Sequence, residues 1–450
     1  MEFEENKMGT EKILPLLLKM SVPPTVSMLT SSLYNIVDSI FVARLGNEAF
    51  AAVSLAFPIQ ILIVALAIGS GVGVNSYVAR KLGEKSFHEA DSAAAHGIIL
   101  SIIHFAVLAF LGFLFIKPFF KMFTENENIF AMGTAYSYIV TFFSFGIITQ
   151  IGIEKTLQGT GNTLAPMFLQ IIGAVTNIIL DPIMIYGYFG FSSMGVTGAA
   201  VATVCGQITA LLCSLYVLFF HKQAVKITLK DFKWNGKIVK EIYNVGIPSF
   251  FIISVSSFMV SSINFILAGI SDAAVSVFGI YYKLQTFVYM PTSGITQGAM
   301  PIMGYNYGAG NKKRLFEALK YSLMICAGIN FIGTLIFWIF PEKILSFFKV
   351  SQEALAIGTL CLKIISTSFI LGSICFIFCC FLQSVGRGIS SLVITLFRQL
   401  LFLIPLAFLF GKLWGLSGVW TSFFAAEAFS CCISLLIFKN FLKNDNIIRK

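Results

Sequence analysis

Residues 182–220 read PIMIYGYFGFSSMGVTGAAVATVCGQITALLCSLYVLFF, a run without any Lys, Arg, Asp, Glu or His. A second such run covers residues 242–271. A helix that crosses a bilayer needs about 20 mostly apolar residues, because lipid offers no water to bind backbone or charged groups. Neither run alternates as the strands of a membrane β-barrel do. The sequence therefore predicts an all-α polytopic membrane protein.

The composition of the whole chain agrees with this prediction. Of 450 residues, 57% are hydrophobic and only 12% are charged, about half the charged share of a soluble domain. Apolar runs bounded by charged residues or by Gly and Pro mark the expected spans. We expect twelve transmembrane helices, at 14–37, 50–77, 93–116, 131–154, 164–186, 197–220, 242–270, 275–299, 319–340, 355–381, 389–410 and 416–438.

The basic residues predict the orientation. If the N-terminus is cytoplasmic, 22 Lys and Arg fall on the inner side and 6 on the outer side. This excess fixes both termini inside, in a cell membrane. A basic cytoplasmic face also suits anionic lipids, so the net charge of +10 requires no nucleic acid as a partner. The nine cysteines all lie in apolar segments, which is typical of small apolar side chains rather than of disulfides or metal ligands.

The chain repeats itself at a nearly constant offset. Five pairs of short segments match: 157–161 with 382–386, 40–59 with 265–284, 83–90 with 310–318, 195–198 with 415–418, and 21–23 with 246–248. We therefore expect two six-helix lobes, 1–220 and 242–450, joined by a basic cytoplasmic linker at 221–241. Lobes of six helices have the same orientation, so a pseudo-twofold axis along the membrane normal is expected, as in many secondary transporters.

A charge within a span is costly unless it faces a cavity or a partner. Two acids lie within the expected spans or at their ends. Asp38 lies four residues after Tyr34, at the end of the first span, and Asp181 lies one helical turn after Asn177 and just before Pro182. A carboxylate with an amide oxygen on one helix face offers the hard oxygen ligands that a small cation needs, and a carboxylate alone suffices for a proton.

Other embedded charges suggest less. Glu154 lies beside Lys155 at the end of a span, where it either forms an interfacial pair with that lysine or acts as a functional acid. For Glu427, an interhelical contact is the favoured interpretation. The roles of Lys283, Lys363 and Arg398 stay open. Phosphate-loop, zinc-protease and serine-nucleophile patterns are absent from the sequence, so neither an enzyme nor a cofactor is expected.

Several motifs in order resemble the multidrug and toxic compound extrusion (MATE) family. They are the Pro-bearing first span ending in Asn35-x-x-Asp38, the turn 157–163, the span with Asn177-x-x-x-Asp181-Pro182, and the segment 195–203. The resemblance covers essentially the whole chain. It implies two six-helix bundles around a central cleft and export of cationic or amphipathic compounds in exchange for Na⁺ or H⁺.

The resemblance also implies an ion-coupling site in the N-terminal lobe. Its members would be Asp38, Asp181, Asn177, Thr203, Tyr34 and Glu154; Asp38, Asn177, Asp181 and Thr203 would be the Na⁺ ligands if Na⁺ is the ion, and Pro23 and Pro24 would let the first span bend. Acids that some members carry in spans 7 and 10 have no counterpart here, which favours coupling through the N-terminal lobe alone.

The resemblance leaves alternatives. A lipid-linked oligosaccharide flippase of the same superfamily is the nearest, and a channel or receptor is the second. We expect the protein to work as a monomer among membrane lipids.

Overall fold

The computed structural model describes residues 6–227, 232–348 and 350–445, and these residues form helices and no strand. The first half contains α1 (Lys7–Thr10), α2 (Ile13–Ala43), α3 (Asn47–Gly83), α4 (Phe87–Phe123), α5 (Glu127–Phe142), α6 (Phe145–Gly159), α7 (Leu164–Tyr186), the 3₁₀ turn η1 (Tyr188–Gly190) and α8 (Val196–Phe220). The second half contains α9 (Gly236–Ala268), α10 (Asp272–Gly308), α11 (Lys312–Ile339), α12 (Pro341–Ser346), α13 (Gln352–Ser366), α14 (Phe369–Ser384), α15 (Gly388–Leu396), the π-helix η2 (Phe397–Phe402) and α16 (Leu403–Asn444).

These helices account for the twelve expected spans. Within the described residues, eight helices are long and apolar enough to cross a membrane, and two bent pairs, α5 with α6 and α13 with α14, raise the number to ten. The run Gly388–Asn444 counts as one of the eight but contains a non-helical residue, Gly415, and therefore supplies two spans. The twelfth is α10, which carries Lys283 and several hydroxyl side chains. Most helices extend a few residues beyond the expected spans, as boundaries set by composition alone cannot include the polar helix ends.

The internal repeat is visible in the backbone. The bends between α5 and α6 and between α13 and α14 measure 44° and 47°. Gly161 and Gly386, which are paired by the sequence repeat, both have positive φ, at 91° and 83°. Gly195 and Gly415 precede the last span of each half with nearly the same angles, φ 55° and ψ −131° against φ 61° and ψ −141°. A residue with a β-carbon rarely adopts such angles, so the two glycines mark equivalent turns.

One match in the repeat needs a new register. The sequence pairs Gly83 with Gly310, at a slightly larger offset than that of Gly161 and Gly386. In the structure, the residue with positive φ in the first of these turns is Lys85, at 60°, and in the second it is Gly310, at 68°. The equivalent positions are therefore Lys85 and Gly310, and their offset is the same as that of Gly161 and Gly386.

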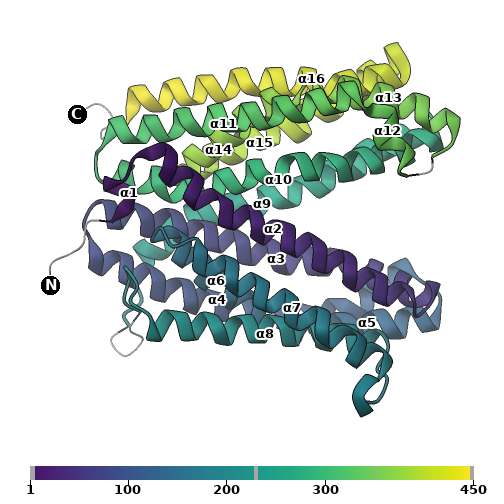
Figure 1. Cartoon of the computed structure of the whole chain (residues 1–450), viewed down its shortest axis with the longest axis horizontal. Coiled ribbons are helices and arrows are strands. Elements are labelled where there is room, and N and C mark those ends of the chain that lie inside the picture. The colour runs from purple at the N-terminus through teal and green to yellow at the C-terminus, as the bar shows by residue number, and fades with distance from the viewer. Residues whose placement is uncertain (1–5, 228–231, 349, 446–450) are drawn as a thin grey trace. The chain divides into compact units, whose positions relative to one another are not determined.

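The chain divides into two compact units. The N-terminal unit comprises Val26–Leu82 and Ser86–Gly246, and the C-terminal unit comprises Met1–Thr25, Gly83–Lys85 and Ile247–Lys450. In the first, α7 packs against α8, and α4 and α8 pack against α5 and α6. In the second, α10 and α14 pack against α11, and α16 packs against α13 and α14 (Figure 1). The expected lobe boundaries, 220 and 242, differ from these in two respects: the second unit resumes at Ile247, inside α9, and α2 is divided between the units.

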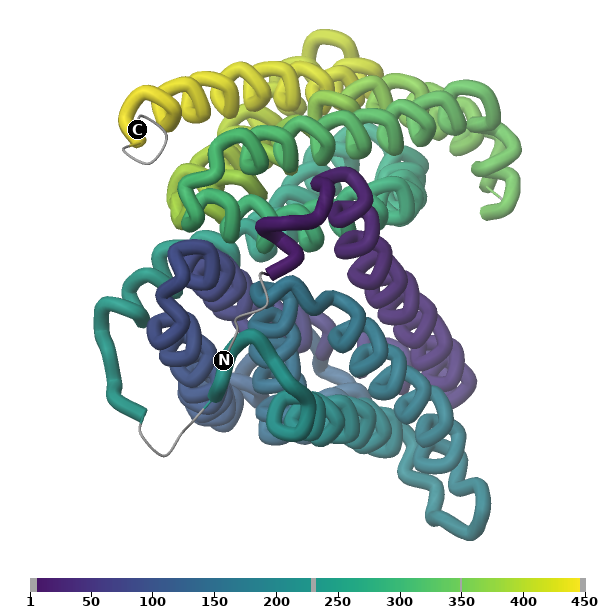
Figure 2. Tube along the Cα trace, turned by 60° about the vertical axis from the view of Figure 1, so that its left-hand side comes forward, coloured from purple at the N-terminus to yellow at the C-terminus, as the bar shows by residue number. Residues whose placement is uncertain are grey.

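The shared helix α2 is continuous. Pro23 and Pro24 lie inside it, directly before the boundary between Thr25 and Val26. The segment before the boundary is held within the C-terminal unit, where Arg314 donates to the backbone oxygens of Met8 and Glu11, at 3.0 and 2.6 Å. Figure 2 shows α1 folded back beside the start of α2, which then runs on without a break.

The expected linker 221–241 is only partly a linker, because α9 already begins at Gly236; residues 228–231 lie outside the described part. His96 of α4 accepts a hydrogen bond from the backbone of Asn235, at 2.9 Å. His104 lies 2.8 Å from the hydroxyl of Tyr243. The histidines of the third span thus make polar contacts within the N-terminal unit.

Candidate ion-coupling site

Two carboxyl groups meet in the N-terminal unit. Asp38 comes from α2 and Asp181 from α7, and their side chains lie within hydrogen-bonding reach of one another. Tyr34, one turn before Asp38, lies near the same pair. Two hydrogen bonds hold α2 along α7 on either side of the acids: Gln170 donates to the hydroxyl of Ser31, and Tyr186 donates to the backbone oxygen of Phe41, both at 2.8 Å.

A close approach of α7 and α8 brings in two further side chains. A β-carbon added to Gly206 would lie 2.7 Å from the backbone oxygen of Gly173, so glycine at these positions lets the two helices touch. Thr203 lies one turn before Gly206 and faces Asn177. The Asn177 amide nitrogen donates to Asp181 Oδ1 at 3.2 Å and lies 3.4 Å from the Thr203 hydroxyl.

The site has more acceptors than donors. Asp38 Oδ1, Asp181 Oδ2 and Asn177 Oδ1 are all buried and have no hydrogen-bond partner in the described part of the chain. The side chains of Asp181 and Asn177 are 0% and 3% exposed. Buried polar atoms are normally satisfied, and two carboxylates in contact repel one another unless a proton or a cation lies between them. The arrangement can therefore hold a positive charge.

The donor set fits a hard cation. Two carboxylates, one amide oxygen and one hydroxyl are oxygen ligands of the kind that small hard ions prefer. Within the described residues, no group of three or more His, Cys, Asp or Glu side chains could hold a metal ion. A Na⁺ ion would thus depend on Asn177 and Thr203 as well as on the acids, whereas a proton would need the carboxyl pair alone.

Two residues near the acids were not expected from the sequence. Gln60 of α3 donates to the hydroxyl of Tyr136 of α5, at 2.5 Å, and Tyr136 is close enough to Asp38 and Asp181 to interact with their charges. Each is a single polar residue in an apolar span. Many residues with a purely structural role have the same pattern, so the sequence does not mark these two as part of a site. Only the packing of α3 and α5 brings them to the acids.

Glu154 lies in a different polar cluster. On α6 it accepts hydrogen bonds from Gln150 and Gln158, at 3.2 and 3.1 Å, and Lys155 donates to Gln158 at 2.9 Å. These partners all lie on its own helix, and none of these bonds joins it to Asp38 or Asp181. The structure brings together Tyr34, Asp38, Asn177, Asp181 and Thr203 but leaves Glu154 apart.

Comparisons with known proteins agree over nearly the whole chain. The MatE family model matches residues 23–183 and 248–409. A FAD transporter of Shewanella oneidensis is 27% identical over 406 residues, which are 90% of this chain and 89% of that protein. The multidrug export protein MepA of Staphylococcus aureus is 25% identical over 424 residues, 94% and 92% of the two chains.

Solved structures give the same answer. The outward-facing conformation of a multidrug resistance MATE family transporter of the MOP superfamily is 27% identical, covers 98% of both chains and superposes with a TM-score of 0.91. A MOP superfamily transporter from Pyrococcus furiosus, described as having a binding pocket of reverse polarity, is 27% identical over 98% of this chain and 99% of its own, with a TM-score of 0.90. Since the family model matches well over half of the residues and both repeats, the chain belongs to the MatE family of membrane transporters.

Proposed function

We propose that this protein is a secondary active efflux antiporter that exports cationic or amphipathic compounds in exchange for Na⁺ or H⁺. The observation that carries the proposal is the contact between Asp38 and Asp181, whose free oxygens are buried beside that of Asn177. Such a pair has a strong affinity for a positive charge, and a site with this property in a transporter fold supports ion coupling.

The proposed mechanism is competition between ion and cargo. When the site is open to the outside, a cation or proton enters between Asp38 and Asp181 and stabilises one arrangement of α2. The helix then bends near Pro23 and Pro24, where two backbone N–H donors are missing. This change lowers the affinity for cargo, which leaves outward, and cargo binding from inside reverses the cycle. Coupling of this kind requires only that ion and cargo prefer different conformations.

The proposal includes the location, the orientation and the oligomeric state of the protein. The protein lies in the cell membrane with both termini in the cytoplasm and works as a monomer. The two named relatives, a FAD transporter and a multidrug export protein, differ in cargo, so the range of compounds must be measured. A flippase would move a lipid-linked cargo without lowering dye accumulation, and a channel would give steady conductance without counter-transport.

The first experiment measures ethidium accumulation in cells that express equal amounts of wild type, Asp38→Asn, Asp181→Asn and the double variant. We expect each single change to raise accumulation to the level of cells without the protein. Glu48→Gln is the matched control, because Glu48 is an acid at the helix end that accepts hydrogen bonds from Asn126 and Asn128. Normal efflux by the double variant under a full ion gradient would refute the proposal.

A second experiment separates the two ions. In proteoliposomes with an imposed Na⁺ or pH gradient, Asn177→Ala and Thr203→Val remove one oxygen ligand each and leave the carboxyl pair. If Na⁺ is the coupling ion, each change should raise the Na⁺ concentration for half-maximal efflux about tenfold, the loss of one charge-assisted contact. If the ion is a proton, the pH-driven rate should change much less.

A further inference from the structure

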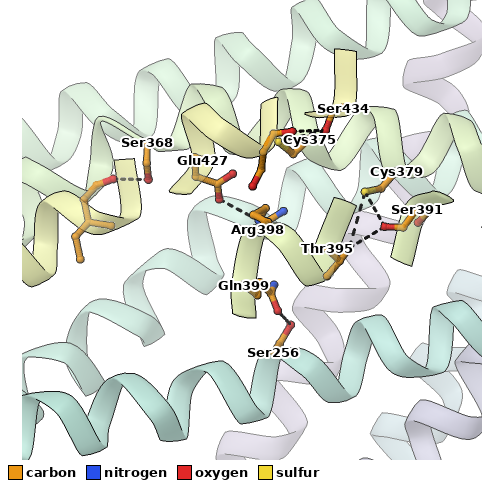
Figure 3. A network of polar contacts seen from close by, with 12 residues as sticks. Ser256, Ser368, Cys375, Cys379, Ser391, Thr395, Arg398, Gln399, Glu427 and Ser434 are labelled. Carbon is orange, nitrogen blue, oxygen red and sulfur yellow. Dashed lines mark hydrogen bonds and ion pairs between the residues drawn. The ribbon is translucent and has the colours of Figure 1, made fainter. Parts of the chain in front are cut away.

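The interior of the C-terminal unit contains a buried ion pair. Arg398 Nε lies 3.0 Å from Glu427 Oε1, and the two side chains are 10% and 11% exposed. Arg398 belongs to the π-helix η2 and Glu427 to α16. π-helices are short, uncommon and frequent at functional sites. Figure 3 shows the two side chains facing one another between α14, α15 and α16.

The guanidinium group is only partly used. The bond to Glu427 engages Nε, and the other contact is with the ring of Phe376, whose centroid lies 4.2 Å from the central carbon. The two terminal amino groups bind no residue in the described part of the chain, and neither is sealed from solvent. In Figure 3, the end of Arg398 that points away from Glu427 is joined to no other drawn residue. The N–H donors of both amino groups are therefore free of partners among the described residues.

Several features hold the pair in this arrangement. A β-carbon on Gly372 would lie 3.3 Å from Glu427 Oε1 and 2.9 Å from the Tyr289 hydroxyl, so glycine leaves room for both. Glu427 Oε2 is buried and has no hydrogen-bond partner among the described residues, and the weakly donating thiol of Cys375 lies close to the carboxylate. Gln399, next to Arg398, accepts a hydrogen bond from Ser256 at 3.1 Å. Glu427 therefore orients Arg398 through Nε and leaves the opposite edge of the fork exposed.

The free edge matches a particular ligand chemistry. Two parallel amino groups of a guanidinium bind both oxygens of a carboxylate or phosphate, which is the strongest pairing available to arginine. Two aromatic rings lie beside the guanidinium group: Phe376, which contacts it, and Tyr289, whose ring centroid is 5.2 Å from that of Phe376.

We propose that Arg398 forms an oxyanion subsite of the cargo site, which takes the carboxylate or phosphate of an amphipathic aromatic compound, with Glu427 as its positioning residue. The inference rests on the proposed function and adds to it a class of cargo, anions and zwitterions. Neither Lys283 nor Lys363 is among the described groups whose charges act on Arg398 or Glu427. The subsite therefore depends on a single cation, which makes it testable by one substitution.

The test is a binding measurement with riboflavin and riboflavin 5′-phosphate, which share one ring system and differ by a phosphate. Purified full-length protein in neutral detergent is titrated by flavin fluorescence, without any ion gradient. We expect the phosphate ester to bind wild type about 10 to 100 times more tightly than riboflavin, the range for a hydrogen-bonded charge pair. Arg398→Gln should abolish this preference, and Arg398→Lys should retain part of it. Lys283→Gln, at a lysine of the same unit, is the control.

Folding is checked separately, because Arg398→Gln leaves Glu427 buried and unpaired. The double variant Arg398→Gln with Glu427→Gln is neutral at both positions and should fold; it too should lose the preference for phosphate while still binding riboflavin. The subsite would be overturned if wild type bound the two flavins with equal affinity. It would also be overturned if the double variant and Arg398→Lys each lost affinity for both flavins to the same extent.

Lipid phosphate is the other source of the same chemistry. If phosphatidylglycerol in nanodiscs competed with the flavin phosphate through Arg398 while free inorganic phosphate did not, the site would belong to a lipid and the proposal would be wrong. Since no gradient is used, this assay is independent of ion coupling. A failed subsite leaves ethidium efflux through Asp38 and Asp181 unaffected, and a failed coupling site leaves flavin binding measurable.

Discussion

The two units each bury a pair of ionisable side chains, but the pairs differ in net charge. In the N-terminal unit, two carboxyl groups, Asp38 and Asp181, lie in contact, and no ion pair joins either to a basic side chain among the described residues. In the C-terminal unit, the carboxylate of Glu427 carries its own counterion, Arg398. In the proposed function the first pair is completed by a cation from solution, whereas the second is already neutral, and its free donors are those that we propose for an anion. The difference indicates how a duplicated chain can divide the handling of ion and cargo between its halves.

The largest expected effect is that neutralising one residue of each pair changes the free energy of unfolding in opposite directions. Removing one partner of a buried ion pair costs about 3–5 kcal/mol, so Arg398→Gln should lower the free energy of unfolding by that amount. Asp181→Asn removes a like-charge repulsion and should raise it. Thermal unfolding in detergent at pH 9 without Na⁺ measures both. Equal destabilisation by the two changes would break the comparison.

The next effect is stabilisation by the coupling ion. A ligand at 100 times its Kd stabilises the folded state by about 2.7 kcal/mol. Na⁺ or acid should therefore raise the unfolding temperature of wild type but not of the Asp38→Asn and Asp181→Asn double variant. The Arg398→Gln and Glu427→Gln double variant should still respond. A response that survives loss of both aspartates would locate the ion elsewhere.

Helix packing behind the acids gives a smaller effect. Gly206→Ala places a β-carbon against the backbone of α7, and overpacking of this kind costs about 1–3 kcal/mol. It should also move Thr203 away from Asn177 and weaken ion-driven efflux. Gly328→Ala is the control, because nothing lies within 4 Å of its added β-carbon. Equal behaviour of the two variants would mean that close contact of α7 and α8 does not matter to the site.

The smallest effect concerns the neighbours of the acids. Tyr136→Phe removes the hydroxyl that accepts a bond from Gln60, a loss of about 1 kcal/mol. We expect a rise of about fivefold in the ion concentration for half-maximal efflux, with little change in the rate at saturation. Tyr138→Phe, two residues away on α5, should change neither. A similar rise in both variants would indicate a general effect on α5.

The sequence predicted those features that repeat or that stand out by charge. The twelve spans followed from apolar length, and the duplication anticipated turns such as those at Gly161 and Gly386, which both have positive φ although they lie in different halves of the chain. Asp38 and Asp181 stood out because charge is rare within spans.

Contacts across helices were less accessible. Glu427 was favoured as an ordinary interhelical contact, and its partner Arg398 stayed open, because pairing depends on the rotation of α16 and η2 about their axes. Gln60 and Tyr136 are 76 residues apart and carry no joint signal in the sequence. Glu154 attracted attention as an acid, yet Gln150 and Gln158 on the same helix account for its oxygens.

The division of α2 between the units also sets an order of events during synthesis. Met8 is held by Asn306, 298 residues later in the chain. At about 5–20 residues per second, a ribosome takes roughly 15–60 s to make that stretch. The segment around Met8 is therefore synthesised long before its partner Asn306, and it lacks this contact while most of the N-terminal unit is synthesised. Membrane insertion factors would meet an N-terminal segment whose final partners do not yet exist, so its handling during translation is part of how this transporter is built.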